Sequence, residues 1–111
     1  MTRNKAIGIL KEAYELCTKI LYGKVNEAYL YGSYAREDFT DQSDVDILLI
    51  ASLTRTEISN LRQEIAVISS DLSLKYDVTI SITVKSYDEF LQHKEILPFY
   101  QNVIKDGIKF P

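Results

Sequence analysis

A run of apolar residues in the middle of the chain constrains the fold more than any other feature. From Asp44 to Ile50 the sequence reads Asp-Val-Asp-Ile-Leu-Leu-Ile, and apolar residues follow Asp46 without interruption. Because side chains alternate between the two faces of a strand, such a run is typical of a strand that is buried on both faces. A strand of this kind needs other elements over both faces of its sheet, so the run predicts a layered domain of helices and sheet.

Patterns on either side of this run predict the remaining elements. Apolar residues spaced by three and four positions predict helices, and strict alternation predicts strands. The predicted order is a helix over 5–22, a strand over 25–31, a short helical stretch over 34–38, the strand 44–50, a long helix behind the capping box Thr54–Glu57, a strand from Asp77 to Val84, a helix capped by Ser86 and Glu89, and a helix opened by Pro98 that ends at Asp106-Gly107. The fold class is therefore α/β (α+β), a small mixed three- to four-stranded sheet flanked by helices, in a single domain over 1–111.

Composition excludes several classes of protein. Thirteen Lys and Arg against sixteen Asp and Glu give a net charge of -3, which argues against direct binding of nucleic acid or of an anionic membrane. A single cysteine, Cys17, excludes an internal disulfide and a multi-cysteine zinc site and fits a reducing compartment. No apolar run approaches the roughly 20 residues of a membrane span. We therefore expect a cytoplasmic protein with no membrane contact.

The negative charge is concentrated in one stretch. Residues 25–54 hold six acids and one cation, whereas the rest of the chain has ten acids and twelve cations. Within that stretch Asp44 and Asp46 lie two apart at a strand start, so both carboxylates point to the same side. Taken alone, such a pair is often a solvated edge. Two like charges this close repel unless a cation lies between them, and Mg²⁺ with substrate phosphates suits such oxygens, so the pair suggests a metal-nucleotide site.

Gly32 and Ser33 follow the first strand and precede the short helical stretch. Glycine lets the backbone turn sharply and approach a ligand, and N–H groups at a helix start favour phosphate. Ser33 can add a hydroxyl donor, and Arg36 adds a guanidinium one turn later. Alone, a Gly-Ser pair is often only a turn and Arg36 only a surface ion pair. Antiparallel pairing of the two strands would bring this phosphate cradle beside the carboxylates.

The order Gly-Ser-x-Ala-Arg, a gap of six residues, and Ser-Asp-x-Asp followed by an apolar strand resembles the nucleotidyltransferase superfamily typified by DNA polymerase β. It looks most like the minimal nucleotidyltransferase branch, and the closing segment 102–108 is similar to the family's C-terminal segment. The resemblance implies a polymerase β-type fold, with Gly32, Ser33, Arg36 and Ser43 on the nucleotide. Two Mg²⁺ ions would be held by carboxylates, Asp44 and Asp46 among them.

The same resemblance implies transfer of a nucleoside monophosphate, AMP from ATP, to a hydroxyl. In this branch the acceptor is a tyrosine of a HEPN-type toxin, to which the nucleotidyltransferase is the antitoxin. The assembly is then a homo- or hetero-oligomer. The alternative is a non-catalytic or weakly catalytic antitoxin that neutralises its partner by binding alone.

Family members generally use a third carboxylate on a neighbouring strand. Asp77 is the only acid on the polar side of the third predicted strand, and we take it as the third catalytic and metal-binding residue. It stands at the beginning of that strand, whereas the family acid tends to lie nearer Ser81. With Ser81 in that position, the site would bind Mg-nucleotide and turn over slowly or not at all.

Three further residues are assigned to structure. His93, the only histidine, lies on a polar helical stretch and is expected at the surface. Cys17 falls on the apolar stripe of the first helix and is expected in the core. Tyr34 lies inside the Gly-Ser motif, where an aromatic ring could border a nucleotide base, but packing is the default.

Overall fold

The computed structural model describes residues 1–110. Six helices and four strands are formed within that range: α1 Arg3–Ile20, β1 Val25–Tyr31, α2 Ser33–Arg36, β2 Val45–Ala51, α3 Arg55–Asn60, α4 Arg62–Tyr76, β3 Ile80–Ser86, α5 Tyr87–His93, α6 Pro98–Asp106 and β4 Ile108–Phe110. The predicted α/β class and the small mixed sheet are confirmed.

The strands form one sheet in the order β3-β2-β1-β4. β1 is antiparallel to β2 and to β4, as predicted for the β1–β2 pair, whereas β2 and β3 are parallel. A parallel pair needs a crossover connection, and α3 and α4 supply it. β2 therefore lies inside the sheet with a neighbour on each side, and β3 lies at one edge.

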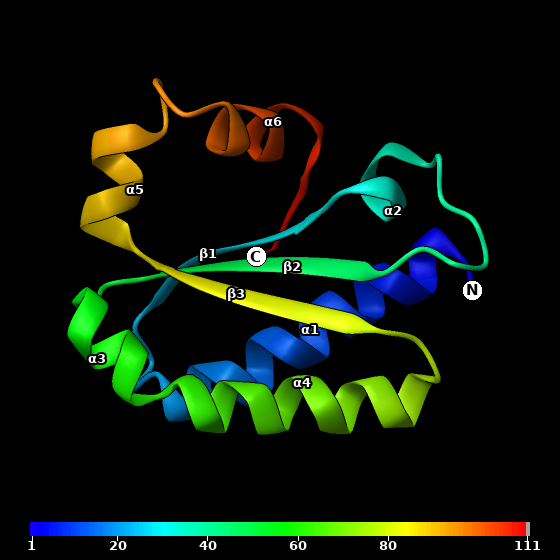
Figure 1. The fold of residues 1–111 in the computed structure, drawn as a ribbon, viewed down its shortest axis with the longest axis horizontal. Coiled ribbons are helices and arrows are strands. Elements are labelled where there is room, and N and C mark those ends of the chain that lie inside the picture. Colours follow the sequence, from blue (N-terminus) through cyan, green and yellow to red (C-terminus); the bar gives the residue numbers. More distant parts are fainter. Residues whose placement is uncertain (111) are drawn as a thin grey trace.

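Helices cover both faces of the sheet, with α1 and α4 on one side and α5 and α6 on the other (Figure 1). The side chains of β2 alternate between these two layers. Val45, Ile47, Leu49 and Ala51 belong to a large core cluster with residues of α1 and α4. Leu48 and Ile50 belong to a smaller cluster with residues of α5 and α6. The uninterrupted apolar run of β2 is therefore explained by burial on both faces.

Local capping sets several helix ends. The side chain of Thr2 accepts from the Lys5 N–H at the start of α1, and the predicted capping box of Thr54 and Glu57 is present at the start of α3. The single long helix predicted behind that box is wrong, because the chain leaves helical geometry at Leu61 and divides it into α3 and α4. Ser86 makes no side-chain capping bond, so the predicted box at the start of α5 is also wrong.

The third predicted strand begins too early. β3 starts at Ile80, because α4 continues to Tyr76 and Asp77 then closes that helix in the left-handed conformation with φ of 53°. Asp77 is consequently a helix-terminating residue and not a strand residue.

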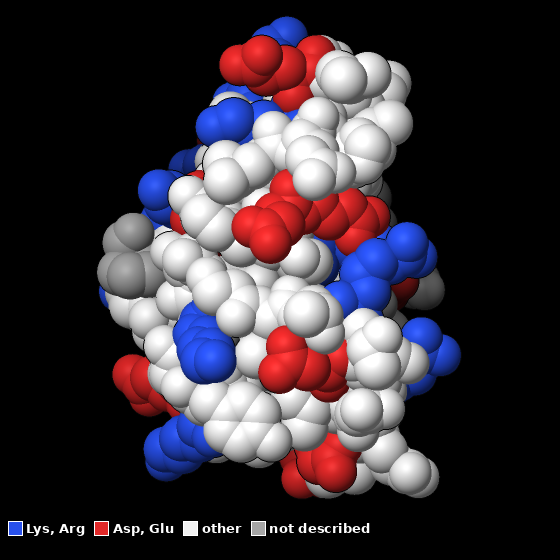
Figure 2. Space-filling view, turned by 90° about the vertical axis from the view of Figure 1, so that its left-hand side faces the viewer, with Lys and Arg blue, Asp and Glu red and all other residues white. Residues whose placement is uncertain are grey.

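Charge is distributed unevenly over the molecule. The end formed by α3 and α5 shows acidic and basic side chains interspersed with uncharged ones (Figure 2). The acid-rich loop after α2 and the start of β2 lie at the opposite end (Figure 1). Among residues 1–110, no helix has the length and apolar character needed to cross a membrane.

Candidate active site at the start of β2

Asp44 and Asp46 lie where the chain enters β2. Asp44 is exposed just before the strand, and Asp46 is half-buried one residue inside it. Asp46 pairs with Tyr31 of β1 on one side and with Ser81 of β3 on the other. Because it alternates with the residues that enter the α1–α4 core, Asp46 stands on the face that carries α5 and α6.

The carboxyl of Asp46 is electrostatically unfavourable in its ionised form. Burial raises its pKa, the neighbouring charge of Asp44 raises it further, and the guanidinium of Arg36 lowers it. The raised pKa means that a charged Asp46 lacks full compensation from the protein. Two such carboxylate groups are the oxygen donors that a hard divalent cation prefers, so Asp44 and Asp46 fit Mg²⁺.

Gly32 brings the main chain against Asp46. Its φ is +78°, a left-handed value that favours glycine, and a Cβ built on it would lie 2.6 Å from Asp46 Oδ2. No side chain can occupy that space without displacing the carboxylate. The cradle between β1 and α2 therefore meets the carboxylate directly, as the predicted antiparallel pairing requires.

The short helix α2 holds Ser33 at its start. The N–H groups of Ala35 and Arg36 both donate to the Gly32 carbonyl at 3.1 Å, which closes the turn. Tyr34 is buried and stacks on Phe39 with ring centroids 4.4 Å apart, so its assignment to packing is confirmed. This packing fixes the turn and leaves Ser33, half-buried, at the mouth of the cradle.

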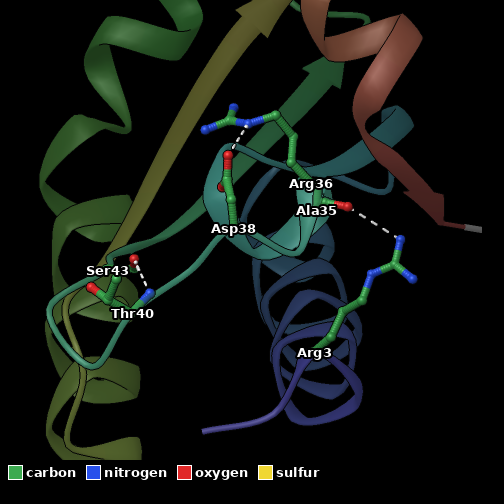
Figure 3. Close-up of polar contacts among 6 residues, drawn as sticks. All are labelled: Arg3, Ala35, Arg36, Asp38, Thr40 and Ser43. Atoms are coloured by element: carbon green, nitrogen blue, oxygen red, sulfur yellow. Dashed lines mark hydrogen bonds and ion pairs between the residues drawn. The ribbon is translucent and has the colours of Figure 1, made fainter.

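Two arginines lie at the end of α2: Arg36 is its last residue, and Arg3 reaches it from α1 (Figure 3). The exposed Arg36 places its Nε 3.1 Å from Asp38 Oδ2, and it is close enough to Asp46 to lower that pKa. Arg3 of α1 donates to the Ala35 carbonyl at 3.2 Å and ties the end of α2 to the first helix. The sequence offered no signal for this role of Arg3, because the two residues are far apart in the chain.

Ser43 closes the loop that leads into β2. Its own N–H donates to the Thr40 carbonyl. Its hydroxyl accepts from the Thr40 N–H at 2.9 Å (Figure 3). The hydroxyl hydrogen of Ser43 takes no part in that bond. Ser43 therefore shapes the approach of the chain to Asp44 and keeps a donor for a ligand.

The structure does not bring Asp77 to the carboxylate pair. Within residues 1–110, no three His, Cys, Asp or Glu side chains come together as a candidate metal site. The β3 residue opposite Asp46 is Ser81, and the exposed Asp77 lies before the strand. The geometry thus places Ser81 where a third carboxylate would have to stand to share an ion with Asp46.

A cavity of about 240 Å³ adjoins the cradle on the side of α6. Gly32 and Arg36 line it with Tyr31 and with Phe99, whose ring meets that of Tyr31 at 5.4 Å edge to face. The burial and the nearby charge of Asp46 raise the pKa of Tyr31. Sequence reasoning missed Tyr31, although the antiparallel register of β1 and β2 would have placed it beside Asp46.

The remaining assignments concern residues away from the site. His93 lies in the last turn of α5 and is only partly exposed, so its surface position is confirmed in part. Cys17 is fully buried in the α1 core, where desolvation raises its pKa to about 11. A thiol of that kind is a packing residue.

Comparison with known proteins identifies the family of the chain. The profile of the family described as polymerase beta, nucleotidyltransferase matches residues 15–108. Two Methanocaldococcus jannaschii proteins are named as proposed protein adenylyltransferases. MJ0604 is 33% identical over 107 residues, covering 96% of each chain, and MJ0141 is 42% identical over 77 residues, covering 68% of this chain and 74% of its own.

The fold also recurs in a solved structure. A mutant of the toxin–antitoxin pair MntA-HpeT superposes with a TM-score of 0.53 and 19% identity, covering 98% of this chain and 72% of that one. At that identity the likeness shows the shared fold alone. The profile match and the relatives together show that the chain belongs to the polymerase β-type nucleotidyltransferase family.

Proposed function

We propose that the protein is a Mg²⁺-dependent adenylyltransferase that moves AMP from ATP to a hydroxyl of a partner protein. The observation that supports this most directly is the abutment of the Gly32 backbone and the Asp46 carboxylate, with 2.6 Å between the carboxylate and the place of a Cβ. A phosphate cradle and a metal-binding carboxylate at that separation suit a triphosphate with its ions.

Each residue of the site has a distinct task in this reaction. Gly32 and Ser33 bind the triphosphate through main-chain N–H groups and a hydroxyl, and Arg36 adds positive charge. Asp44 and Asp46 would hold the Mg²⁺, two ions in the fullest form of the site. Bound there, the metal neutralises the triphosphate and its leaving group. The acceptor oxygen bonds to the α-phosphorus, the bond to the β-phosphate oxygen breaks, pyrophosphate leaves, and the acceptor proton passes to solvent or to a carboxylate.

The proposed acceptor is a tyrosine of a HEPN-type toxin. Two relatives carry names that specify transfer to protein, and the fold is shared with a toxin–antitoxin pair.

A second candidate is an antitoxin that neutralises its partner by binding, with little or no transfer. Ser81 favours it, because a serine opposite Asp46 supplies no third carboxylate for the metal or for the proton of the acceptor. The two candidates predict the same complex and differ only in chemistry.

Transfer can be tested with ATP labelled at its α-phosphate, Mg²⁺, and the protein encoded beside this one. We expect label on a tyrosine of that protein and none in the absence of Mg²⁺. Nucleotide binding should be measured in the same samples. Bound nucleotide without any transfer would reject the adenylyltransferase and leave the binding antitoxin.

Paired substitutions separate the two candidates. The double change Asp44→Asn with Asp46→Asn should reduce transfer by at least about a hundredfold, or roughly 2.7 kcal/mol, because the metal loses both carboxylate ligands and their negative charge. The matched control is Glu64→Gln with Asp71→Asn, which removes two exposed acids from α4. If Asp44→Asn with Asp46→Asn still neutralises the toxin fully, the protein neutralises it by binding and not by adenylyl transfer.

A further inference from the structure

A groove of about 310 Å³ runs along the outer edge of β3 and is separate from the carboxylate pair. Neither Asp44 nor Asp46 lines it. One wall comes from α3 and α4, the other from Glu89 of α5, and the floor is β3 from Ile82 to Ser86. Since β3 is an edge strand, the groove exposes a side of the sheet that has no neighbouring strand.

The main chain of β3 is capped at one outward position only. The N–H of Ile80 donates to Ser73 Oγ at 3.0 Å, and its carbonyl accepts from the Ser69 hydroxyl, so both groups of Ile80 face α4. N–H and C=O of a strand residue point the same way and alternate along the strand. Ile82 and Val84 therefore also present their groups outward.

No comparable cap covers Ile82 or Val84. Across residues 1–110, neither residue's main chain makes a hydrogen bond to a helix, turn or side chain. Both residues are half-exposed and line the groove. Two donors and two acceptors thus stand in a row at the spacing that an added strand would pair.

The side chains around this row select the charge of an occupant. Arg55, Arg62 and Lys85 line the groove with a single acid, Glu89, whose carboxylate lies 3.8 Å from Arg55 Nε. The lining is therefore net positive although the protein is negative overall. Two copies joined edge to edge would bring their cations together, so the charge disfavours a second copy and favours an acidic partner.

We propose that this groove is a docking site for an extended, acidic segment of a partner protein, which adds to the sheet as a fifth strand beside β3. The segment pairs with the main chain of Ile82 and Val84 and places acidic side chains near Lys85 and Arg55. Alternate apolar side chains of the segment pack on Ile58 and Ile65, which face the groove. This docking requires no nucleotide and stands independently of adenylyl transfer.

The test uses a blocked peptide of alternating Glu and Val, eight residues long, with the Lys-Val peptide as control. We expect the Glu-Val peptide to bind in low salt at least tenfold more tightly than the Lys-Val peptide. Hydrogen exchange of the Ile82 and Val84 amides should slow on binding. Equal binding of the two peptides, absence of binding, or unchanged exchange at both amides would overturn the proposal.

Two variants test the contacts separately. Val84→Pro removes one outward N–H without removing a bond to β2, and we expect it to weaken peptide binding at least tenfold, whereas Val84→Ala stays close to the original. Should the proline variant fail to fold, Arg55→Glu with Lys85→Glu keeps the backbone and should reverse the preference toward the Lys-Val peptide. A dimer of the chain that Val84→Pro or the charge reversal abolishes would assign the edge to a second copy and overturn the proposal.

Discussion

The two faces of β2 differ in what covers them. On the α1–α4 side the strand is apolar along its whole length, from Val45 to Ala51. On the α5–α6 side only Leu48 and Ile50 are packed into a cluster, and Asp46 occupies the place nearest the start of the strand. The α1–α4 face stabilises the fold, whereas the α5–α6 face carries a pair of acids where apolar side chains could otherwise pack.

This division explains how a small domain carries an unfavourable site. Burial and Asp44 raise the pKa of Asp46, so its ionised form costs free energy in the absence of a cation. The large core on the opposite side offsets that cost. Functional sites commonly depart from the local rules that stabilise a fold, and here the departure is confined to one face.

Truncating a buried side chain on the α1–α4 face of β2 should lower the free energy of unfolding more than any other substitution proposed for this sheet. Leu49→Ala should lower the free energy of unfolding by about 2–5 kcal/mol, because Leu49 is fully buried between the strand and the helices of the larger core. Leu74→Ala, at a site 81% exposed on α4, should change it by less than about 0.5 kcal/mol. Urea unfolding measures both. Similar values for the two variants would mean that this face does not carry the stability.

A second change acts where the two strands meet at the site. Gly32→Ala should lower stability by about 1–2 kcal/mol, because alanine is strained at a φ of +78° and its Cβ would strike the Asp46 carboxylate. It should also weaken Mg-ATP binding. Gly8→Ala is the matched control, since no atom lies within 4 Å of its Cβ, and in the helix α1 it should stabilise by about 0.5–1 kcal/mol. Thermal unfolding measures the change in stability, and calorimetric titration measures the affinity for Mg-ATP. An unchanged Mg-ATP affinity in Gly32→Ala would exclude the turn at Gly32 and Ser33 as the phosphate-binding site.

The packed face was predictable from the sequence because its signal is local. The apolar run located β2, and the spacing of apolar residues located α1 and the bounds of β1. The break at Leu61 was not predictable in the same way, because the apolar stripe continues through it and only the backbone changes direction. The spacing of apolar residues indicates which face of a helix is buried, but it does not indicate where one helix ends and the next begins.

The other face was predictable only in part. The motif spacing led to Gly32, Asp44 and Asp46, which the structure brings to one end of the sheet. The start of the third strand was predicted too early, because an alternating pattern reads Asp77 to Thr79 as strand when they form the turn that follows α4. Strand register decides which residue stands beside Asp46, and register is a tertiary property that pairs Asp46 with Ser81.

The pairing of Asp46 with Ser81 can be tested by placing an acid at position 81. Ser81→Asp places a carboxylate on the strand next to Asp46 and should raise the rate of adenylyl transfer about tenfold, or roughly 1.4 kcal/mol in the barrier. It should lower the stability of the metal-free protein, because a third negative charge joins the site. Ser81→Asn has nearly the same size without the charge and should leave the rate near that of the original. Equal rates for the two variants would show that a third carboxylate does not limit this site.

The smallest effect concerns the pH dependence of the acidic face. The pKa of Asp46 is raised in the folded state, so folding favours its protonated form, and that stabilisation is complete below the ordinary pKa of an aspartate. It is lost as the pH rises through the raised pKa. A cation bound between the carboxylates would restore it only where Asp46 is ionised. Mg²⁺ should therefore raise the unfolding temperature more at pH 8 than near the ordinary aspartate pKa of about 3.9, against NaCl of equal ionic strength, and Asp46→Asn should remove the difference. An equal Mg²⁺ shift at both pH values, or the same dependence in Asp46→Asn, would place the ion elsewhere on the surface.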